Sequence, residues 1–321
     1  MDTAELSFTA APPMLLSGTA NRPLAEGIAE VLQRELCDVT IKRFADGEIF
    51  VRINENVRGR DVFLIQPTCT PAENILELLI LIDAAMRASA ARVTAVISYY
   101  GYGRADRKDQ PRVSIAAKMM ANLITAAGTD RVLSIDFHQH QLQGFFDIPV
   151  DHLYAAPVFR RYYEQKQLDN LAVVASDVGA AKMARGYAKR LGAELAIVDK
   201  RRPGPNLAEV ANIVGDVEGR TCIIPDDMID TGGTMSTTVE VLRERGAGEI
   251  YILATHALLS GPAVERLAAA NVKEITVTDT VPISEETRRA LPNLKVLSVA
   301  SLLAQAIERT HTNSSVSSLF N

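Results

Sequence analysis

The chain has 321 residues, 47% hydrophobic and 23% charged, so it is long enough for two globular domains of ordinary composition. Its formal net charge is −5 and its acidic and basic residues are interspersed, which excludes a basic face for nucleic acid. The first residues contain no apolar segment of the signal-peptide type, and no apolar run is long enough to cross a bilayer. We therefore expect a cytoplasmic protein without nucleic-acid or membrane partners.

Short β-rich segments alternate with longer segments of helical period along most of the chain. In chain order the pattern predicts strand 61–66, helix 74–90, strand 92–100, helix 114–128, strands 130–136 and 170–177, helix 180–192, strands 194–199 and 220–225, helix 234–246 and strand 249–256. Buried strands that alternate with helices are typical of α/β proteins. We expect parallel sheets flanked by helices on both faces.

A weak internal repeat divides the chain. The segment VRGRDVFLIQ, which begins at Val57, resembles VEGRTCIIPD, which begins at Val217, and Gly59 and Gly219 are 160 positions apart (219 − 59). Duplication of one α/β module explains this better than chance similarity between two common strand–helix units. We expect duplicated domains over 1–155 and 156–321, with a last helix that can pack back on the N-terminal domain.

Three carboxylates and two adjacent glycines follow strand 220–225, in the segment DDMIDTGGT. Ligands of open parallel sheets bind beyond the carboxyl ends of strands. Glycines before a helix let backbone N–H groups approach a phosphate, and carboxylates accept hydrogen bonds from sugar hydroxyls or face a divalent cation. The segment therefore predicts a sugar-phosphate site. A solvated acidic turn is the alternative, but it explains only Asp230, as a helix cap, and leaves the Asp226–Asp227 pair unexplained.

The first copy of the repeat differs at the matching position, where Gln66-Pro67 precedes TPAEN. Only the C-terminal copy therefore has the acidic, glycine-rich strand end. Elsewhere, YGYGRADRK groups cations beside an acid, and VDKRRPGPN is either a solvated turn or a mobile loop that closes over phosphates. His138 and His140 follow strand 130–136 with a spacing that would place both on one face of an extended chain, where a metal ligand is plausible.

Together these motifs resemble the ribose-phosphate diphosphokinase family, the synthetases of phosphoribosyl diphosphate, in its phosphate-activated bacterial and animal class. The resemblance extends from LSGTANRPLAEGIAEVL through RFADGEIFVRINENVRG, LQGFFDIPVD, IVGDVEG and DDMIDTGGT to RTHTNSSVSSLF. It implies two phosphoribosyltransferase-like domains, the first on the ATP side and in oligomerisation, the second carrying the ribose-5-phosphate loop and a mobile catalytic loop. It also implies Mg²⁺ as cofactor, a homo-oligomer that is usually a hexamer, and phosphate and ADP as effectors.

The resemblance assigns roles to individual positions. It implies catalytic cations at Lys200 and Arg202, with Arg202 also toward ribose 5-phosphate, and three further groups of site residues. These are an ATP site at Phe44, Asp46, Gly47, Glu48, Arg104, Ala105 and Asp106; a ribose-5-phosphate site at Asp226, Asp227, Asp230, Thr231, Gly232, Gly233 and Thr234; and a metal site at His138, Asp177 and Asp136. The family contacts adenine with the Phe44 to Glu48 segment of a neighbouring subunit.

The chain departs from the family pattern at several positions. Ala105 stands where glutamine is usual, Ala180 and Met183 where glycine and arginine are usual, and Pro225 where a β-branched residue is usual, while Ser114 and Ala116 alter the segment before the following helix. Alanine resists positive φ, so Ala180 puts the geometry of its loop in question. Two other hypotheses stay open. The departures at Ala105, Ala180 and Met183 favour a non-catalytic regulatory homologue, and the acidic, glycine-containing loop is shared with phosphoribosyltransferases that consume phosphoribosyl diphosphate.

Overall fold

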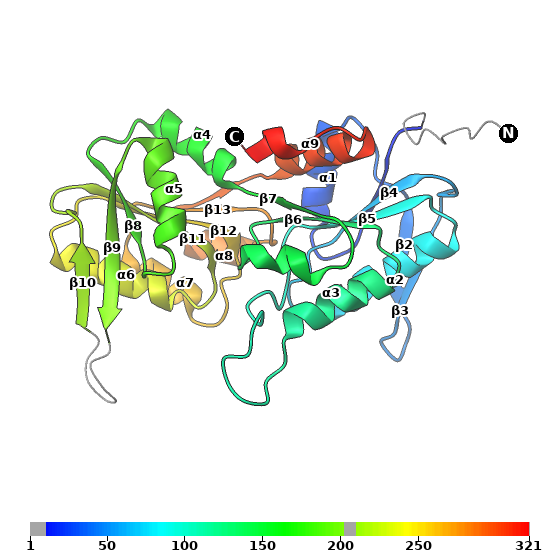
Figure 1. The fold of residues 1–321 in the computed structure, drawn as a ribbon, viewed down its shortest axis with the longest axis horizontal. Coiled ribbons are helices and arrows are strands. Elements are labelled where there is room, and N and C mark those ends of the chain that lie inside the picture. Colours follow the sequence, from blue (N-terminus) through cyan, green and yellow to red (C-terminus); the bar gives the residue numbers. More distant parts are fainter. Residues whose placement is uncertain (1–10, 202–209, 321) are drawn as a thin grey trace. The chain divides into compact units, whose positions relative to one another are not determined.

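A computed structural model describes residues 11–201 and 210–320 of the chain (Figure 1). By its internal contacts the chain forms two compact units. Unit 1 comprises Met1–Tyr154 together with Ser298–Asn321, and unit 2 comprises Ala155–Leu297. The chain therefore leaves unit 1, builds unit 2, and returns to unit 1 with its last helix. None of the helices in these two described stretches is long and apolar enough to cross a membrane.

Unit 1 is built on a five-stranded parallel sheet. Its strands, in spatial order, are β1 (Met14–Ser17), β4 (Asp61–Ile65), β5 (Arg92–Ile97), β6 (Arg131–Ile135) and β7 (Val150–Leu153). An antiparallel hairpin of β2 (Val39–Arg43) and β3 (Ile49–Ile53) lies outside this sheet. The helices of the unit are α1 (Arg22–Val31), α2 (Glu73–Arg87), α3 (Ala116–Ala126), the 3₁₀ turns η2 (His140–Phe145) and η3 (Ser317–Phe320), and α9 (Ala300–His311).

Unit 2 is built on a seven-stranded sheet. Its strands, in spatial order, are β10 (Val210–Val214), β9 (Glu194–Arg201), β8 (Leu171–Ala175), β11 (Thr221–Ile229), β12 (Ile250–Ala257), β13 (Glu274–Thr278) and β14 (Leu294–Leu297). All neighbours are parallel except β9 and β10. The helices of the unit are α4 (Ala156–Lys166), α5 (Ala181–Leu191), α6 (Gly233–Glu244), α7 (Ala263–Ala270) and α8 (Glu285–Ala290).

The two units repeat one module. The order β1–β4–β5–β6–β7 in unit 1 corresponds to β8–β11–β12–β13–β14 in unit 2, and β4 and β11 begin 160 residues apart (221 − 61). The turns before these strands also match, because Gly59 and Gly219 both have positive φ, +66° and +64°. The predicted duplication and the α/β fold class are confirmed. Two strand pairs, β9–β10 and β2–β3, are antiparallel.

The returning C-terminal segment is fixed to unit 1 by a buried charge cluster. Asp61, at the start of β4, accepts hydrogen bonds from Arg92 and from Nδ1 of His311, the latter 2.8 Å away. Arg92 also donates to the carbonyl of Thr310 at 3.0 Å. Asp61 and His311 are buried, so removing one partner would leave the other polar group without compensation.

Candidate active site

The acid pair lies inside a strand and not after one. β11 continues through Pro225, Asp226 and Asp227 to Ile229, so the predicted strand end at residue 225 is wrong. The physical reason is asymmetric pairing: the ladder with β8 stops at Ile223, whereas the ladder with β12 continues to the pair Ile229–Ala257. Pro225, which lacks an N–H group, lies just beyond the last residue that pairs with β8. The second half of β11 thus has one open edge.

Three carboxyl groups influence one another at this open edge. Burial, together with the negative charges of Asp227 and Asp177, raises the pKa of Asp226 from 3.8 to about 8. The backbone N–H of Asp227 donates to Asp226 Oδ1 at 2.9 Å, which opposes the rise but does not cancel it. Acids placed this close together have a high affinity for groups that donate hydrogen bonds or carry positive charge.

The loop after β11 is shaped to receive an anion. Gly232 has φ +73° and immediately precedes α6, and a side chain there would be strained whatever the space. Within residues 210–320, no group accepts a hydrogen bond from the backbone N–H of Thr231, Gly232, Gly233 or Thr234. Four such donors at the start of a twelve-residue helix, with its dipole behind them, form a phosphate-binding geometry. The structure therefore brings the predicted ribose-5-phosphate residues from Asp226 to Thr234 together.

A neighbouring segment holds this loop in place. The N–H groups of Leu258 and Ser260 donate to the carbonyls of Ile229 and Asp230, at 3.0 and 2.8 Å. Arg266 in α7 donates from Nη1 to the carbonyl of Thr231 at 3.0 Å. Sequence reasoning did not identify Arg266, because it lies 32 residues beyond Thr234 (266 − 234) in an ordinary amphipathic helix.

The Asp177 loop of unit 2 has ordinary backbone geometry despite its alanine. Ala180 has φ −75° and ψ −9°, which alanine adopts without strain, so the doubt raised by the missing glycine does not hold. Its N–H donates to Asp177 Oδ1 at 2.8 Å. The side chain of Asp177 is exposed and contributes negative charge at Asp226.

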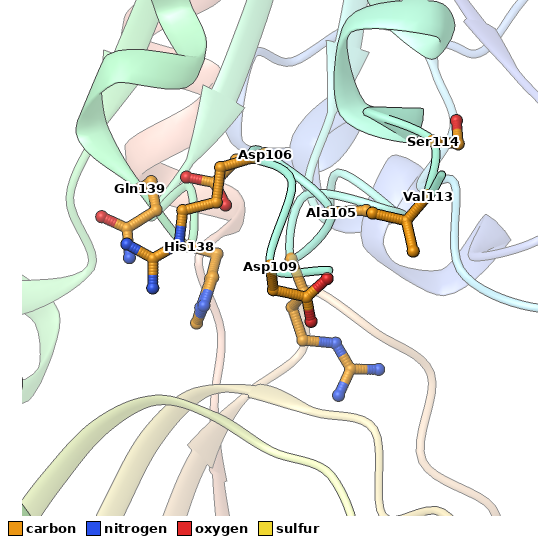
Figure 2. Close-up of a pocket in the computed structure, with 9 residues that line it drawn as sticks. Ala105, Asp106, Asp109, Val113, Ser114, His138 and Gln139 are labelled. Carbon is orange, nitrogen blue, oxygen red and sulfur yellow. The ribbon is translucent and has the colours of Figure 1, made fainter. Parts of the chain in front are cut away.

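Unit 1 contains a separate cavity of about 380 Å³ (Figure 2). Two segments line it, one between β5 and α3 and the other after β6, with the residues Arg104, Ala105, Asp106, Arg107, Asp109, Val113, Ser114, His138 and Gln139. Figure 2 shows Asp106, His138 and Gln139 on one side of the cavity and Val113 and Ser114 on the other. Three predicted ATP residues and one predicted metal ligand therefore share one cavity.

The histidine pair does not lie on one strand face as expected. β6 ends at Ile135, His138 is in a bend, and His140 begins the 3₁₀ turn η2. Asp136 adopts a positive φ of +40°, which turns the chain away from the strand direction. His138 then faces the cavity, whereas the ring of His140 packs against His152 and Tyr154.

The remaining ATP residues form the tip of the β2–β3 hairpin. Gly47, with φ +94°, donates to the carbonyl of Phe44 at 2.9 Å, and the N–H of Glu48 donates to Asp46 Oδ1 at 3.1 Å. Asp46 and Gly47 therefore have a local role in the turn. Phe44 is half exposed, and Lys42 lies 5.9 Å from its ring centroid, so an aromatic face and a positive charge are presented together.

The predicted metal and catalytic residues stay predictions. Among the residues that the structure describes, no three His, Cys, Asp or Glu side chains form a cluster that could hold a metal ion. His138 and Asp136 belong to unit 1 and Asp177 to unit 2. Lys200 lies in β9, opposite Ala211 of β10, so it is in a strand and not in the predicted turn; its side chain and all of Arg202 lie outside the described residues.

The chain matches models of known domains and is similar to curated and solved proteins. Residues 13–128 match the N-terminal domain of ribose phosphate pyrophosphokinase, and residues 200–321 match the phosphoribosyl synthetase-associated domain. Ribose-phosphate pyrophosphokinase from Synechococcus elongatus is 50% identical, covering 99% of both chains. The same enzyme from a Nostoc species is 53% identical, covering 95% of this chain and 93% of the relative.

The fold is similar to that of a solved enzyme. The crystal structure of phosphoribosylpyrophosphate synthetase from Mycobacterium smegmatis superimposes with a TM-score of 0.89 at 43% identity, covering 95% of this chain and 100% of that one. Sequence and fold agree over nearly the full length of both chains. The chain therefore belongs to the ribose-phosphate pyrophosphokinase family.

Proposed function

We propose that the protein is a ribose-phosphate diphosphokinase, which transfers the diphosphoryl group of ATP to the 1-hydroxyl of ribose 5-phosphate and releases AMP. Its membership of the family and the full-length relatives support this reaction. The observation that carries it in this chain is the loop from Thr231 to Thr234, whose four N–H groups have no acceptor within residues 210–320. A sugar 5-phosphate is the anion that such a loop suits.

The acid pair would hold the sugar. Asp226 and Asp227 precede the phosphate loop by a few residues, so a pentose bound through its 5-phosphate would extend toward them. Their carboxyl oxygens accept hydrogen bonds from sugar hydroxyls. Little covalent chemistry is required, because the chain has to align the 1-hydroxyl with the β-phosphorus of ATP and offset negative charge on the phosphoryl oxygens.

ATP would bind at the unit 1 cavity. Arg104 and Arg107 supply charge that complements a triphosphate, and Ser114 adds a hydroxyl to the cavity wall. Ala105 contributes only a methyl group where the family usually has glutamine, so its backbone is the remaining polar element. We propose that Phe44 contacts the adenine of a neighbouring subunit, as an exposed aromatic ring at a hairpin tip can do.

Mg²⁺ fits the donor groups of the chain. Hard carboxylate oxygens are its preferred ligands, and Asp177, Asp226 and Asp227 supply such oxygens, with the negative charges of Asp227 and Asp177 both acting on Asp226. We propose Asp177 as a ligand in unit 2 and His138 with Asp136 as ligands in unit 1, with nucleotide oxygens completing the coordination. Bound Mg²⁺ would neutralise charge on the triphosphate.

The proposed location, oligomeric state and effectors follow from membership of the same family. We propose a cytoplasmic homo-oligomer, with a hexamer as the expected form, and phosphate and ADP as effectors. Of the altered residues, Ser114 precedes α3 and Ala116 is its first residue, so the strength of the phosphate response is the property that they are expected to change.

An AMP-release assay tests the reaction. The purified protein is incubated with ATP, ribose 5-phosphate and Mg²⁺ across a series of phosphate concentrations, and AMP and phosphoribosyl diphosphate are measured together. Equal amounts of the two products are expected. A nucleobase-dependent phosphoribosyltransferase would release no AMP, and a regulatory homologue would release none unless an active synthetase were added.

Lys200 tests the catalytic loop. Lys200→Ala is expected to lower turnover by about 10²-fold or more, because a lost charge stabiliser costs that much in comparable enzymes. Binding of ribose 5-phosphate should stay close to wild type. Unchanged turnover would remove Lys200 from the mechanism.

A further inference from the structure

Arg266 lies outside the Thr231–Thr234 loop and donates a hydrogen bond to the backbone of that loop. Arg266 lies in the first turn of α7, and its Nη1 is 3.0 Å from the carbonyl oxygen of Thr231. The two helices approach closely here, because a Cβ added to Gly232 would lie 3.4 Å from Ala263 Cα and one added to Gly233 would lie 3.5 Å from Arg266 Nη1. Both distances are ordinary van der Waals contact, so α7 packs directly against the loop, and glycine is required at position 232 by its φ of +73°.

The geometry of the peptide bond connects this contact to the anion site. In a trans peptide the carbonyl of Thr231 and the N–H of Gly232 share one plane and point in opposite directions. Because Arg266 holds the carbonyl, it fixes the N–H of Gly232 on the other side of the loop, toward the space where an anion would bind. A charged donor on the carbonyl also polarises the peptide and strengthens that N–H as a donor.

The charge of Arg266 is available for this role. Its guanidinium is a positively charged hydrogen-bond donor, and none of the salt bridges within residues 210–320 includes it. We propose that Arg266 is a positioning residue for the 5-phosphate of ribose 5-phosphate, acting through the Thr231–Gly232 peptide and not by direct contact. This inference rests on the proposed function, since it names a further determinant of the same site.

Arg243 provides a matched control. It is also an exposed arginine of unit 2, and its Nη2 donates to the carbonyl of Asn271 at 2.7 Å. It lies at the opposite end of α6 from the loop, about 15 Å along a helix that rises 1.5 Å per residue. Arg266→Met and Arg243→Met therefore remove the same kind of hydrogen bond, one at the loop and one far from it.

The experiment measures AMP release and thermal stability for the wild type, Arg266→Met, Arg266→Lys and Arg243→Met. Arg266→Met should raise the KM for ribose 5-phosphate by about 10-fold, the effect of one hydrogen bond from a charged donor, while kcat and the KM for ATP change by less than about 2-fold. Arg266→Lys should recover part of the loss, because an ammonium can still donate to the carbonyl. In the absence of ATP, ribose 5-phosphate should raise the Tm of Arg266→Met less than that of the wild type.

The outcomes separate the inference from the function on which it rests. If the wild type releases no AMP, the proposed function fails whatever Arg266 does. If the wild type is active and Arg266→Met keeps the wild-type KM for ribose 5-phosphate, the positioning role is wrong. It is equally wrong if Arg243→Met raises that KM to the same extent, because the effect would then be one of general stability.

Discussion

The two copies of the module differ at the end of one matching strand, which is β4 in unit 1 and β11 in unit 2. In unit 2 the end of β11 presents half-buried acids and a loop whose four N–H groups have no acceptor within residues 210–320. In unit 1 the end of β4 is closed: Gln66, the counterpart of Asp226 at the offset of 160, is fully buried and accepts a hydrogen bond from Ala20 N–H at 3.1 Å. The proposed ligand site thus lies in one copy, whereas in the other copy the matching side chain is hydrogen-bonded within the unit.

A carboxylate of the chain fills the closed end. Glu77, buried in α2, accepts from the N–H of Thr19 at 2.6 Å and from its hydroxyl, and also from Gln66 Nε2 at 2.9 Å. Gly18 permits this packing, since a Cβ there would lie 2.2 Å from Gln66 Oε1. Thr19 and Ala20 follow β1, so the groups at the end of β4 are bonded to the neighbouring turn of the same unit.

The largest expected effect is on activity at the open end. Asp226→Ala should lower kcat/KM for ribose 5-phosphate by about 10²-fold, because a hydroxyl acceptor and a cation partner are lost together. Gln66→Ala, at the matching position of unit 1, should keep wild-type kcat/KM at 25 °C. Steady-state AMP release measures both. If the two variants lose activity equally, the functional difference between the copies is refuted.

The buried polar groups at the end of β4 should contribute to the free energy of unfolding. Glu77→Ala leaves the N–H of Thr19 and Gln66 Nε2 without their acceptor in a buried site, which should lower the free energy of unfolding by about 2 to 3 kcal/mol. Glu26→Ala, which removes an exposed ion pair with Arg22, should cost under about 0.5 kcal/mol. Urea denaturation compares them, and equal costs would mean that the hydrogen bonds of Glu77 do not stabilise unit 1.

The acid pair should give unit 2 a characteristic pH dependence. The folded-state pKa of Asp226, about 8, lies above the ordinary value of 3.8, so the folded chain holds a proton that the unfolded chain releases. Stability from this group is complete below pH 4 and is lost as pH rises toward 8, at up to about 1.4 kcal/mol per pH unit. Asp226→Asn should flatten that slope in thermal melts. A slope that is identical in both proteins would contradict the shifted pKa.

The smallest expected effect is at the glycine turn that both copies share. Gly59 and Gly219 have the same φ, and a Cβ at either would meet no atom within 4 Å. Alanine should therefore cost each unit only its backbone strain, about 1 kcal/mol, and by nearly equal amounts. Calorimetric midpoints of Gly59→Ala and Gly219→Ala provide the comparison. A clear inequality would show that the two turns differ in the unfolded or folded chain despite their matching geometry.

The long buried strands and the amphipathic helices could be predicted from sequence. β4, β5 and β12 are continuous apolar runs, and the repeat around Gly59 and Gly219 was visible because the turn demands glycine twice. β1, β7 and β14 have only four residues each, too few to establish a period. The extension of β11 to Ile229 was missed because strand length there depends on which neighbour pairs, and no local pattern encodes that.

The residues of the candidate site could likewise be predicted only in part from the sequence. The phosphate loop was predicted because glycine and acid types are constrained locally. Asp109 and Val113 lie in the same segment as the predicted ATP residues, whereas Gln139 reaches the cavity from the segment after β6, which only the folded arrangement could reveal. Arg266 likewise acts from a helix whose sequence has no special feature, through a single hydrogen bond to the backbone.

The Asp61–Arg92–His311 cluster has a consequence for the order in which the protein is made. A ribosome completes β1 to β7 early, yet the helix that packs on α1 and supplies His311 is translated last. Unit 2, by contrast, is one uninterrupted stretch from Ala155 to Leu297 and can fold during synthesis. Unit 1 is thus begun first but completed after unit 2, and a chain shortened to end at Leu297 would keep all of unit 2 and lose the helix that completes unit 1.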